Sequence, residues 1–481
     1  MKNLTLENIS RAVEGKLYTR EGIDDEELLK EASSLVIDSR KAEAGGIFIA
    51  TKGERVDGHS FIPQVIDKGV LGVICERKPE NVNGNIILVK DSLKALRDLA
   101  KYYKEQLKAK TIGIIGSVGK TSTKEMVASV MSEAFKVTKT QGNFNNAIGV
   151  PLTIFSMTEE TELAVIEMGI SDFGEMSVLG DMVKPDYVVM TNIGPCHLEQ
   201  LKDLDGVLKA KTEVFDFIKE GGRAILNGDD EKLKSIKSAA GREPVFYGRS
   251  DKNSIYAKSI RDEFFEGIDV EVGFNRGAFN PDKKEEDSLR ESFNIHIPLP
   301  GLHMVDNALA AIACGLEFSM DIEAIKRGIE KVEGTKGRSN PIYTGKYLLV
   351  DDCYNANPKS MKAALDLLSK SEKRKAAILG DMFELGENSA AMHADIGKYA
   401  VNSGVKLLLI AGENSLDMYK EALKAKEACK REVYIRYFED TDKLINALSQ
   451  DDLIKQDDVV LVKASHGMHF ESVVDKLSVF D

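Results

Sequence analysis

GIIGSVGKTSTKEM, residues 113–126, decides how the middle of this chain folds. An apolar run leads into it and apolar residues at helical spacing follow it, so the pattern predicts a strand, a glycine loop and a helix. The full phosphate-loop pattern needs a glycine where Ile114 stands, so this loop is a shorter variant. We predict a phosphate cradle in which backbone amides face an anion, Lys120 reaches the terminal phosphates and the Thr121 hydroxyl meets Mg²⁺.

Further apolar runs divide the chain into three units. Its 481 residues exceed what one hydrophobic core normally supports. Short apolar runs separated by helix-length sequence are typical of parallel sheets with crossover helices; they are LAVIEMG, DYVVMTNIG and RAILNGDD, then YLLVDD, KAAILGDM, VKLLLIAG and DDVVLVKAS. We predict an α/β fold of three domains: a mixed unit over 1–108 that ends in a helix over 92–110, a central P-loop ATPase-like parallel sheet over 109–333, and a Rossmann-like unit over 334–481 without the glycine fingerprint.

One segment does not follow this alternation of short apolar runs and helix-length sequence. Alternating apolar residues at 268–274 and 293–299 flank the polar stretch FNPDKKEEDSLRES. This pattern predicts a β-hairpin with a solvated, mobile tip, to which we assign no chemistry.

Composition excludes several classes of function. The net charge of −13 argues against a nucleic-acid groove. The five cysteines are scattered without a CxxC pair, so we expect no disulfide framework and no zinc site. No apolar stretch reaches the length of a signal-peptide core or a membrane span. We therefore expect a cytosolic protein that neither binds nucleic acid nor inserts into a membrane. We also expect a monomer, although the sequence itself does not reveal the oligomeric state.

Polar side chains end two strands next to the glycine loop. Glu167 ends LAVIEMG, and His197 follows DYVVMTNIG. Because parallel strands open at one sheet edge, both side chains are predicted near the phosphate, where they suit a nucleotide's Mg²⁺. Lys211 lies on a predicted helix in LKAKTEVFDFI, and its position alone indicates an ordinary exposed lysine.

Amides form a second group of candidates. Asn145 and Asn146 serve either a ligand or a turn. His303 and Asn307 share a helix face, where Asn307 either pairs with an adenine edge or caps the helix. The third unit adds polar residues near strand ends, which suggest a second site facing the first: Arg338, Asp351, Asp352, Asn355 and Asn357.

Six tracts, in this order, carry a family resemblance: DSRKAEAGGIFIATKG, GNFNNAIGVPLT, NIGPCHLE, AKTEVF, DDCYNANPKSM and GDMFELG. Over its whole length the sequence resembles the Mur ligase family, the ATP-dependent amide ligases that build the peptidoglycan stem peptide. It is most similar to the members that join D-alanyl-D-alanine to UDP-N-acetylmuramoyl-tripeptide. The DNPR-like signature of members that add diaminopimelate is missing. Whether the tripeptide ends in lysine or diaminopimelate stays open.

The resemblance implies a role for each domain: UDP-substrate binding for the first, ATP binding for the second and dipeptide binding for the third. It implies an ATP site of Gly116, Ser117, Val118, Gly119, Lys120, Thr121, Ser122, Asn307, Arg338 and Asp352. It implies Mg²⁺ on Thr121, Glu167, His197 and Lys211, the lysine as a carbamate. The implied substrate contacts are Ser39 and Arg40 on the UDP-sugar side, Asn145 and Asn146, and Asn355 and Asn357 by the dipeptide. The implied catalytic residues are Lys120, His197, Lys211 and Arg338.

Two positions depart from the family pattern. Met304 follows His303 where the family often has asparagine, and Lys463-Ala464-Ser465 stands where Lys-Gly-Ser is expected. The second departure leaves the role of Ser465 open.

The implied chemistry moves the γ-phosphate of ATP onto a carboxylate to give an acyl phosphate, which the amine of D-alanyl-D-alanine then attacks. Because water would destroy an acyl phosphate, we expect the third domain to close over the site before the reaction. Two alternatives remain: another carboxylate–amine ligase similar to folylpolyglutamate synthase, and a regulatory P-loop NTPase.

Overall fold

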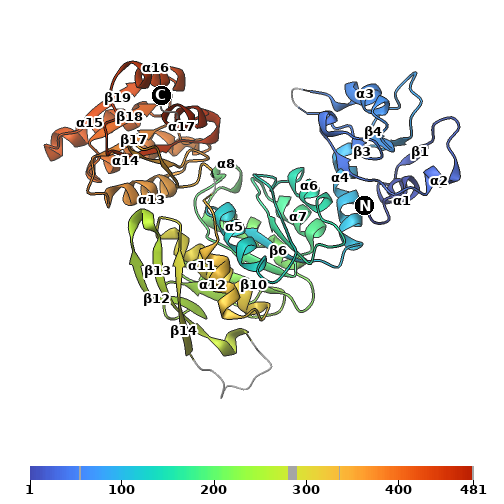
Figure 1. Ribbon diagram of the computed structural model, residues 1–481, viewed down its shortest axis with the longest axis horizontal. Coiled ribbons are helices and arrows are strands. Elements are labelled where there is room, and N and C mark those ends of the chain that lie inside the picture. The colour runs from blue at the N-terminus through green and yellow to red at the C-terminus, as the bar shows by residue number, and fades with distance from the viewer. Residues whose placement is uncertain (54–55, 280–289, 335, 479–481) are drawn as a thin grey trace.

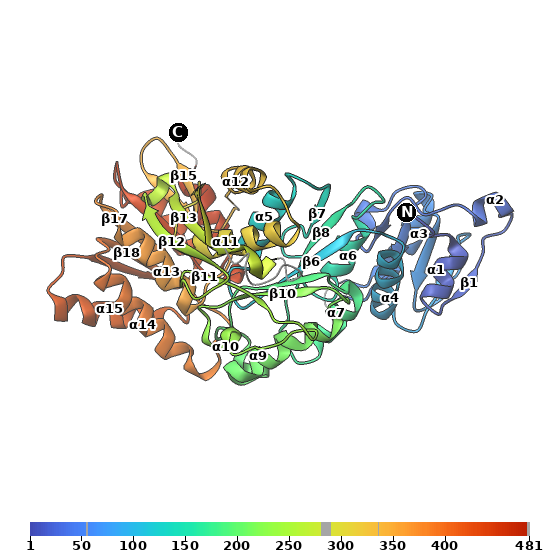
Figure 2. The same cartoon turned by 90° about the horizontal axis from the view of Figure 1, so that it is seen from below.

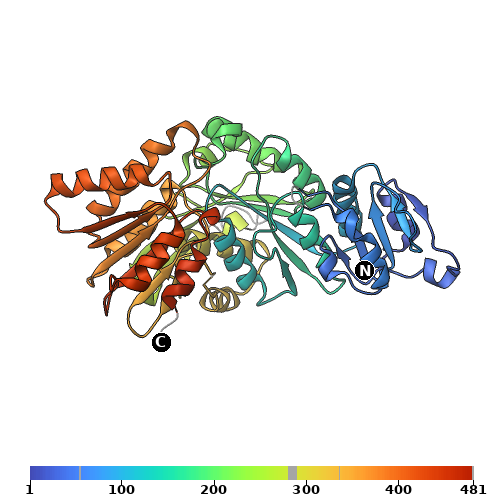
Figure 3. The same ribbon diagram turned by 90° about the horizontal axis from the view of Figure 1, so that it is seen from above.

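The computed structural model describes residues 1–53, 56–279, 290–334 and 336–478, which fold around three separate β-sheets. The central sheet lies between the N-terminal and C-terminal ones along the longest axis of the molecule (Figure 1). The views from below and above show the same order (Figure 2 and Figure 3). The prediction of an α/β fold with three domains is confirmed. No helix of the described residues is long and apolar enough to cross a membrane.

The N-terminal sheet is small and mixed. Its strands lie in the order β1 (Lys16–Tyr18), β5 (Ile86–Leu88), β4 (Gly72–Cys75), β3 (Ile47–Ile49) and β2 (Leu35–Val36), with only β1 antiparallel to its neighbour. The helices of this part are α1 (Leu6–Ala12), α2 (Asp25–Leu28), α3 (Ile62–Asp67) and α4 (Ser92–Glu105). The Asp91 side chain caps α4. The predicted extension of this helix to residue 110 is wrong, because Lys110 already begins the first strand of the central sheet.

The central sheet has nine strands in the part of the chain that the structure describes. Their order is β14 (Arg290–Ile297), β13 (Ile268–Asn275), β12 (Ile255–Asp262), β11 (Val245–Gly248), β10 (Arg223–Asn227), β9 (Tyr187–Met190), β6 (Lys110–Ile115), β8 (Leu163–Glu167) and β7 (Val137–Lys139). All neighbours from β7 to β12 are parallel. The helices are α5 (Lys120–Met131), α6 (Gly149–Phe155), α7 (Glu175–Val183), α8 (Leu198–Leu201), α9 (Leu204–Thr212), α10 (Glu231–Lys234), α11 (His303–Glu317) and α12 (Ile322–Glu330).

The predicted hairpin is present, and its two strands are β13 and β14, which pair antiparallel from Ile268–Ile297 to Asn275–Arg290. Its other neighbour, β12, makes the hairpin part of a three-stranded ribbon that extends the central sheet. Residues 280–289 of the predicted tip lie outside the described residues. Strands β7, β11 and β12 were not predicted, because they are short or carry charged residues on their solvent face.

The C-terminal sheet has six strands in the order β15 (Asn340–Tyr343), β16 (Leu348–Asp351), β20 (Val459–Lys463), β17 (Lys375–Leu379), β18 (Leu407–Ala411) and β19 (Tyr434–Phe438). Only β15 is antiparallel. Side chains of α13 (Pro358–Ser369), α14 (Ser389–Asn402) and α15 (Leu416–Cys429) form the core on one face, and those of α16 (Thr441–Gln450) and α17 (Glu471–Ser478) on the other. The sequence predicted the four inner strands and missed both edges, where exposed polar residues weaken the apolar signal.

The apolar core is divided unevenly among the domains. One cluster runs without interruption from the N-terminal domain through α4 into one face of the central sheet. A second fills the opposite face of the central sheet beneath α5, α11 and α12. The C-terminal domain has its own two clusters, and Phe265 from the turn after β12 is the central-domain residue buried in one of them.

Candidate active site

The glycine loop follows β6, which lies between β8 and β9 in the central sheet. Strand β6 is therefore the point at which the order of the strands in the sheet reverses, and the loop begins at its carboxyl end. Open α/β sheets bind ligands at this point. Gly116 packs so closely on β9 that an added Cβ would lie 1.9 Å from Thr191 Oγ1. Gly119 begins α5 with φ +85°, a conformation that glycine adopts without strain.

Asn192 fixes the loop from the neighbouring strand. Its backbone carbonyl accepts from Ser117 N at 3.0 Å, and its side-chain Oδ1 accepts from Val118 N at 3.0 Å. Its Nδ2 donates to the Val118 carbonyl at 2.9 Å. The amides of Ser117 and Val118 thus hold the loop together in this structure, and their predicted contact with a phosphate stays a prediction. The amides of the first turn of α5 remain for that purpose.

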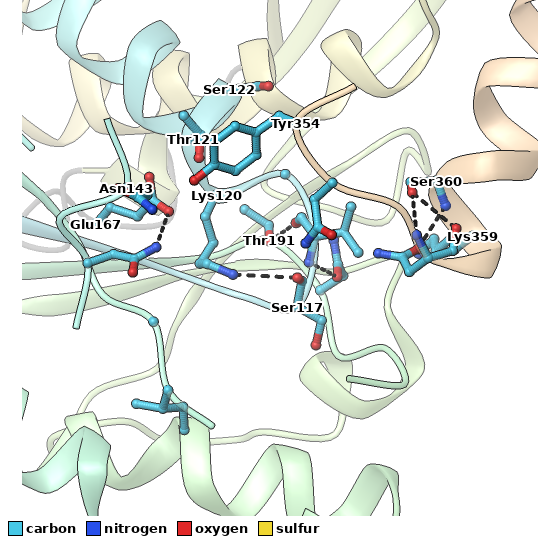
Figure 4. A pocket seen from close by; sticks show the side chains of 18 of the residues that line it. Ser117, Lys120, Thr121, Ser122, Asn143, Glu167, Thr191, Tyr354, Lys359 and Ser360 are labelled. Carbon is cyan, nitrogen blue, oxygen red and sulfur yellow. Dashed lines mark hydrogen bonds between the residues drawn. The ribbon is translucent and has the colours of Figure 1, made fainter. Parts of the chain in front are cut away.

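Lys120 sits at the start of α5 and bends back over the loop. Its Nζ donates to the Gly116 carbonyl at 2.9 Å and, more weakly, to the Ser117 carbonyl at 3.5 Å, the second of which Figure 4 shows. Burial lowers the pKa of this lysine, and the positive charge of Arg338 lowers it further, while Glu167 opposes the change. Arg338, a cation of the C-terminal domain, lines the same pocket as the phosphate loop of the central domain.

Glu167 ends β8 beside the loop and is 1% exposed. Its Oε1 accepts from Asn145 Nδ2 at 2.8 Å (Figure 4). Its Oε2 is buried and has no hydrogen-bond partner among the described residues. A buried carboxylate oxygen without a partner is costly, so this oxygen points to a missing ligand.

His197 lies just before α8 with φ +50°. Its Nδ1 lies 3.1 Å from Oε2 of Glu384, which comes from the C-terminal domain and also has a positive φ of 60°. Burial lowers the pKa of the imidazole, and Glu384 opposes this change. A neutral ring whose Nδ1–H faces a carboxylate leaves Nε2 for a metal, the usual arrangement of a metal-binding histidine.

Lys211 is on α9 as predicted, but it is only 1% exposed, so its interpretation as an ordinary surface lysine is wrong. Burial lowers its pKa from 10.5 to about 8, and the charge of Lys120 adds to the shift. No carboxylate pairs with it in the described part of the chain. An unpaired buried lysine is rare, which suggests that its amine serves a reaction.

The residues present suit Mg²⁺. No group of three His, Cys, Asp or Glu among the described residues forms a complete metal cage. Mg²⁺ does not require one, because it is normally held by one or two carboxylates together with phosphates and water. The partnerless Oε2 of Glu167 supplies such a carboxylate beside the phosphate loop.

The C-terminal domain brings Arg338 to the site. Its guanidinium stacks on the Tyr354 ring, with Cζ 4.1 Å from the centroid, and it forms no ion pair with another described residue. Asp352 accepts from Ser339 N at 2.9 Å and pairs with Lys463 at 2.7 Å. This carboxylate therefore holds the chain segment that carries Arg338.

One cleft of about 1320 Å³ collects these side chains from the central and C-terminal domains, and Leu93 and Arg97 of the N-terminal domain also line it. It is lined by most of the predicted set, namely Ser117 to Ser122, Asn145, Asn146, Glu167, His197, Asn307, Arg338, Asp352, Asn355 and Asn357. Gly116 and Lys211 are not among the residues that line it. Ser39 and Arg40 are not brought to it: they form a 3₁₀ turn in the N-terminal domain, where Arg40 pairs with Asp38 at 2.8 Å.

Several of the predicted amides already have structural partners. Asn146 Oδ1 accepts from Gly149 N at the start of α6, and Asn357 caps α13 in a box with Ser360. Asn307 Oδ1 accepts from Thr123 at 2.9 Å. Their ligand roles stay predictions.

Sequence reasoning missed three residues that shape the site, Asn192, Tyr354 and Glu384, and left the role of Ser465 open. The three missed residues stand inside tracts that were singled out, so their position was visible although their contacts were not. Ser465 Oγ accepts from Phe383 N at 2.9 Å and thus fixes the loop that carries Glu384. No sequence signal could pair Glu384 with His197, because the two residues belong to different domains.

Three family models match the chain. Residues 31–104 match the Mur ligase family catalytic domain, residues 114–315 the Mur ligase middle domain, and residues 337–466 the Mur ligase glutamate ligase domain. The chain belongs to the Mur ligase family.

Several relatives at 30–36% identity carry one name. The chain is 36% identical over 445 residues to the UDP-N-acetylmuramoyl-tripeptide--D-alanyl-D-alanine ligase of Bacillus subtilis (strain 168), covering 92% of each chain. It superimposes on MurF from Acinetobacter baumannii with a TM-score of 0.84 at 29% identity over 98% of each chain. It superimposes on the MurF ligase of Thermotoga maritima in complex with ADP with a TM-score of 0.78 at 25% identity, covering 95% of this chain and 98% of that one.

Proposed function

We propose that this chain joins D-alanyl-D-alanine to UDP-N-acetylmuramoyl-tripeptide, with ATP and through an acyl phosphate, to give the UDP-pentapeptide, ADP and phosphate. The names of its relatives support this choice of substrates. The observation that carries the proposal is the meeting of the phosphate loop and Arg338, from two different domains, in one cleft. A site that needs two domains suits a reaction in which ATP activates one substrate for attack by another.

Two cationic side chains offset the electrostatic repulsion between the two reacting groups. The γ-phosphate and the carboxylate that accepts it are both anionic, so bringing them together requires fixed positive charge. Lys120 provides it from the loop and Arg338 from the facing domain. We propose that Glu167, His197 and the Thr121 hydroxyl hold Mg²⁺, which when bound would neutralise phosphate charge.

The C-terminal domain has two further tasks. It presents polar groups of Asn355 and the start of α13 to the cleft, which would hold the incoming dipeptide. By resting on His197 through Glu384 it also covers the phosphate loop, so that closure excludes water before the acyl phosphate forms. We propose that this domain moves as a rigid body to open and close the site.

Lys211 is proposed to carry a carbamate that serves as a further metal ligand. Carbamate formation needs the neutral amine, and a pKa of about 8 makes roughly a quarter of the lysines neutral at pH 7.5, against about a thousandth at 10.5. At fixed dissolved CO₂, reactivation of CO₂-depleted enzyme should therefore be about 20-fold faster at pH 8.5 than at pH 6.5.

The Lys211→Arg variant keeps the positive charge but forms no such carbamate, so it should lose most of its activity. Lys209→Arg, two residues earlier on α9, is the matched control and should change nothing. Near-normal activity of Lys211→Arg, or no carbamate signal from labelled bicarbonate in the wild type, would contradict the carbamate.

The proposed function is tested by phosphate release with UDP-N-acetylmuramoyl-tripeptide and D-alanyl-D-alanine, each omitted in turn. We expect sustained release only when both are present. Release with folate substrates and glutamate would favour a folylpolyglutamate synthase-like ligase. Fast turnover with ATP alone would favour a regulatory NTPase.

We also propose a cytoplasmic monomer, because the cytoplasm supplies ATP and keeps thiols reduced. All five cysteines are free. Sedimentation of the purified chain would test the monomeric state.

A further inference from the structure

Lys124 is a second lysine on the phosphate helix, and no step of the proposed reaction uses it. It lies one helical turn after Lys120 on α5, and its side chain is completely buried, with 0% exposed. A lysine is almost never buried to this extent unless it is paired. Its partners should therefore explain its presence.

Three acceptors surround its ammonium group. Nζ donates to the Thr140 carbonyl at 2.7 Å and pairs with Glu125 Oε1 at 3.0 Å. The third is Oε2 of Glu167, at 3.9 Å. That distance is too long for a hydrogen bond but short enough for a substantial attraction between buried charges.

The arrangement of ion pairs indicates that Lys124 is the counter-charge of Glu167. Glu125 also pairs through its other oxygen, Oε2, with Lys139, and neither residue lines the cleft. Burial raises the pKa of Glu125, yet contacts with Lys139 and Lys124 outweigh this and hold it below its usual value. With Glu125 balanced by Lys139, Lys124 remains as the counter-charge of Glu167, which forms no other ion pair in the described part of the chain.

The remaining contacts hold Lys124 Nζ at 3.9 Å from Oε2 of Glu167. Thr140 N donates to the Val165 carbonyl and Thr140 Oγ1 accepts from Glu167 N, both at 3.0 Å, so the Thr140 carbonyl is fixed relative to β8. Because the shorter bond to that carbonyl anchors Nζ, the lysine does not advance to bond Oε2. The opposite carboxylate oxygen is fixed by Asn145, so the group cannot rotate.

We propose that Lys124 is a positioning residue that balances the charge of Glu167 while leaving its Oε2 free for the metal ion. The inference rests on the proposed function, in which Glu167 holds Mg²⁺. If Nζ lay one ångström closer, it would form a hydrogen bond with Oε2 of Glu167 and block that oxygen as a metal ligand. An apolar residue in place of Lys124 would leave the Glu167 carboxylate without a counter-charge in the metal-free enzyme.

Metal binding without turnover tests this role. Mn²⁺ binding to the ADP complex is followed by electron paramagnetic resonance in the wild type, Lys124→Gln, Lys124→Arg and Glu167→Gln. We expect about 10–100-fold weaker Mn²⁺ binding in Lys124→Gln, the usual effect of losing an outer partner of a metal ligand, with ADP binding in EDTA unchanged. Lys124→Arg keeps the charge and should stay within about tenfold of the wild type.

Lys104→Gln is the matched control. Lys104 is also buried, at 5% exposed, but it donates to the Ala109 carbonyl and does not line the cleft. This variant should lose stability without changing Mn²⁺ binding. Unchanged Mn²⁺ binding in Lys124→Gln would overturn the inference, as would an equal loss in Lys124→Arg.

Two further outcomes separate the possible failures. If Glu167→Gln binds Mn²⁺ like the wild type, the proposed metal site itself fails; if only Lys124→Gln does, the inference about Lys124 fails alone. If Lys124→Gln does not fold, Glu125→Gln replaces it: with the Glu125 charge gone, the Thr140 carbonyl alone holds Nζ back, and the whole attraction of the lysine falls on Glu167, so Mn²⁺ binding should weaken. Unchanged binding in that variant would also overturn the inference.

Discussion

The central domain joins its two neighbours in different ways. Towards the N-terminus the junction is a continuous apolar core, in which α4 packs on α6 and α7 and the Tyr103 hydroxyl donates to the Met157 carbonyl at 2.8 Å. Towards the C-terminus the contacts are mainly polar, such as His197 with Glu384 and Asp262 with Lys370. The turn after β12 is the apolar contact among the described residues: Phe265 is buried in the C-terminal core and Phe264 packs against it, and the turn lies against α13 (Figure 1).

This difference indicates which domain moves. Separating the first two domains would expose a large apolar area to water, at about 25 cal/mol per Å², so we expect them to behave as one body. Separating the C-terminal domain exposes little apolar surface, and its polar groups find water instead. Mobility is thus expected where the site needs to open, with the Phe264–Phe265 turn as the point of contact about which the domain swings.

The largest expected effect tests the shared core. Leu99 on α4 is completely buried, so Leu99→Ala should cost about 2–5 kcal/mol of unfolding free energy. Hydrogen exchange should rise in both the N-terminal and the central sheet, because one core serves both. The control Leu409→Ala, equally buried in β18, should raise exchange in the C-terminal domain only. If hydrogen exchange in Leu99→Ala rose in the N-terminal sheet only, the claim that one core serves both domains would be wrong.

The second prediction concerns the aromatic contact. Phe265→Ala removes a side chain that is 9% exposed, and we expect its burial energy, about 1.5–3 kcal/mol, to be lost from docking of the C-terminal domain. Solution scattering should show a more extended molecule, whereas the unfolding of each domain stays unchanged. Val178→Ala, an exposed apolar residue on α7, serves as the control. Identical scattering profiles for Phe265→Ala and the wild type would count against the turn as a joint.

A third, somewhat smaller effect is expected at the polar contact. Glu384→Gln removes the charge that faces His197 and should lower the rate about 10–100-fold, as losing the outer partner of a metal-binding histidine does. Stability should change by less than about 0.5 kcal/mol, because the Glu384 side chain is 70% exposed. Glu387→Gln in the same exposed loop is the control. An unchanged rate would show that the contact is incidental.

The smallest effect is expected for the ion pair between Asp262 of the central domain and Lys370 of the C-terminal domain. Asp262→Asn breaks the contact with Lys370 and should weaken docking by about 0.2–1 kcal/mol, less at high salt. A salt titration of scattering in the variant and the wild type measures it. A loss as large as that of Phe265→Ala would mean that charge, and not the aromatic turn, holds the two domains together.

The inner strands and the glycine loop were readable from the sequence because buried parallel strands are continuous apolar runs bounded by polar tips. Edge strands such as β15 and β19 were missed, since solvent on one side leaves no such run. In the site, Glu167 was predicted from its place at a strand end, and the structure brings it beside the loop. The burial of Lys211 was not predictable, because helical periodicity says which residues share a face but not what covers that face.

By itself the sequence determined the three α/β domains, the phosphate loop and the family, because these depend on local patterns of apolar, glycine and polar residues along the chain. Only the tertiary structure decided that Ser117 and Val118 give their amides to Asn192, that Glu384 meets His197, and that Lys124 stops short of Glu167. Each of these depends on contacts between segments far apart in the sequence. Such contacts are set by how the domains pack, and packing leaves no periodic signal in the chain.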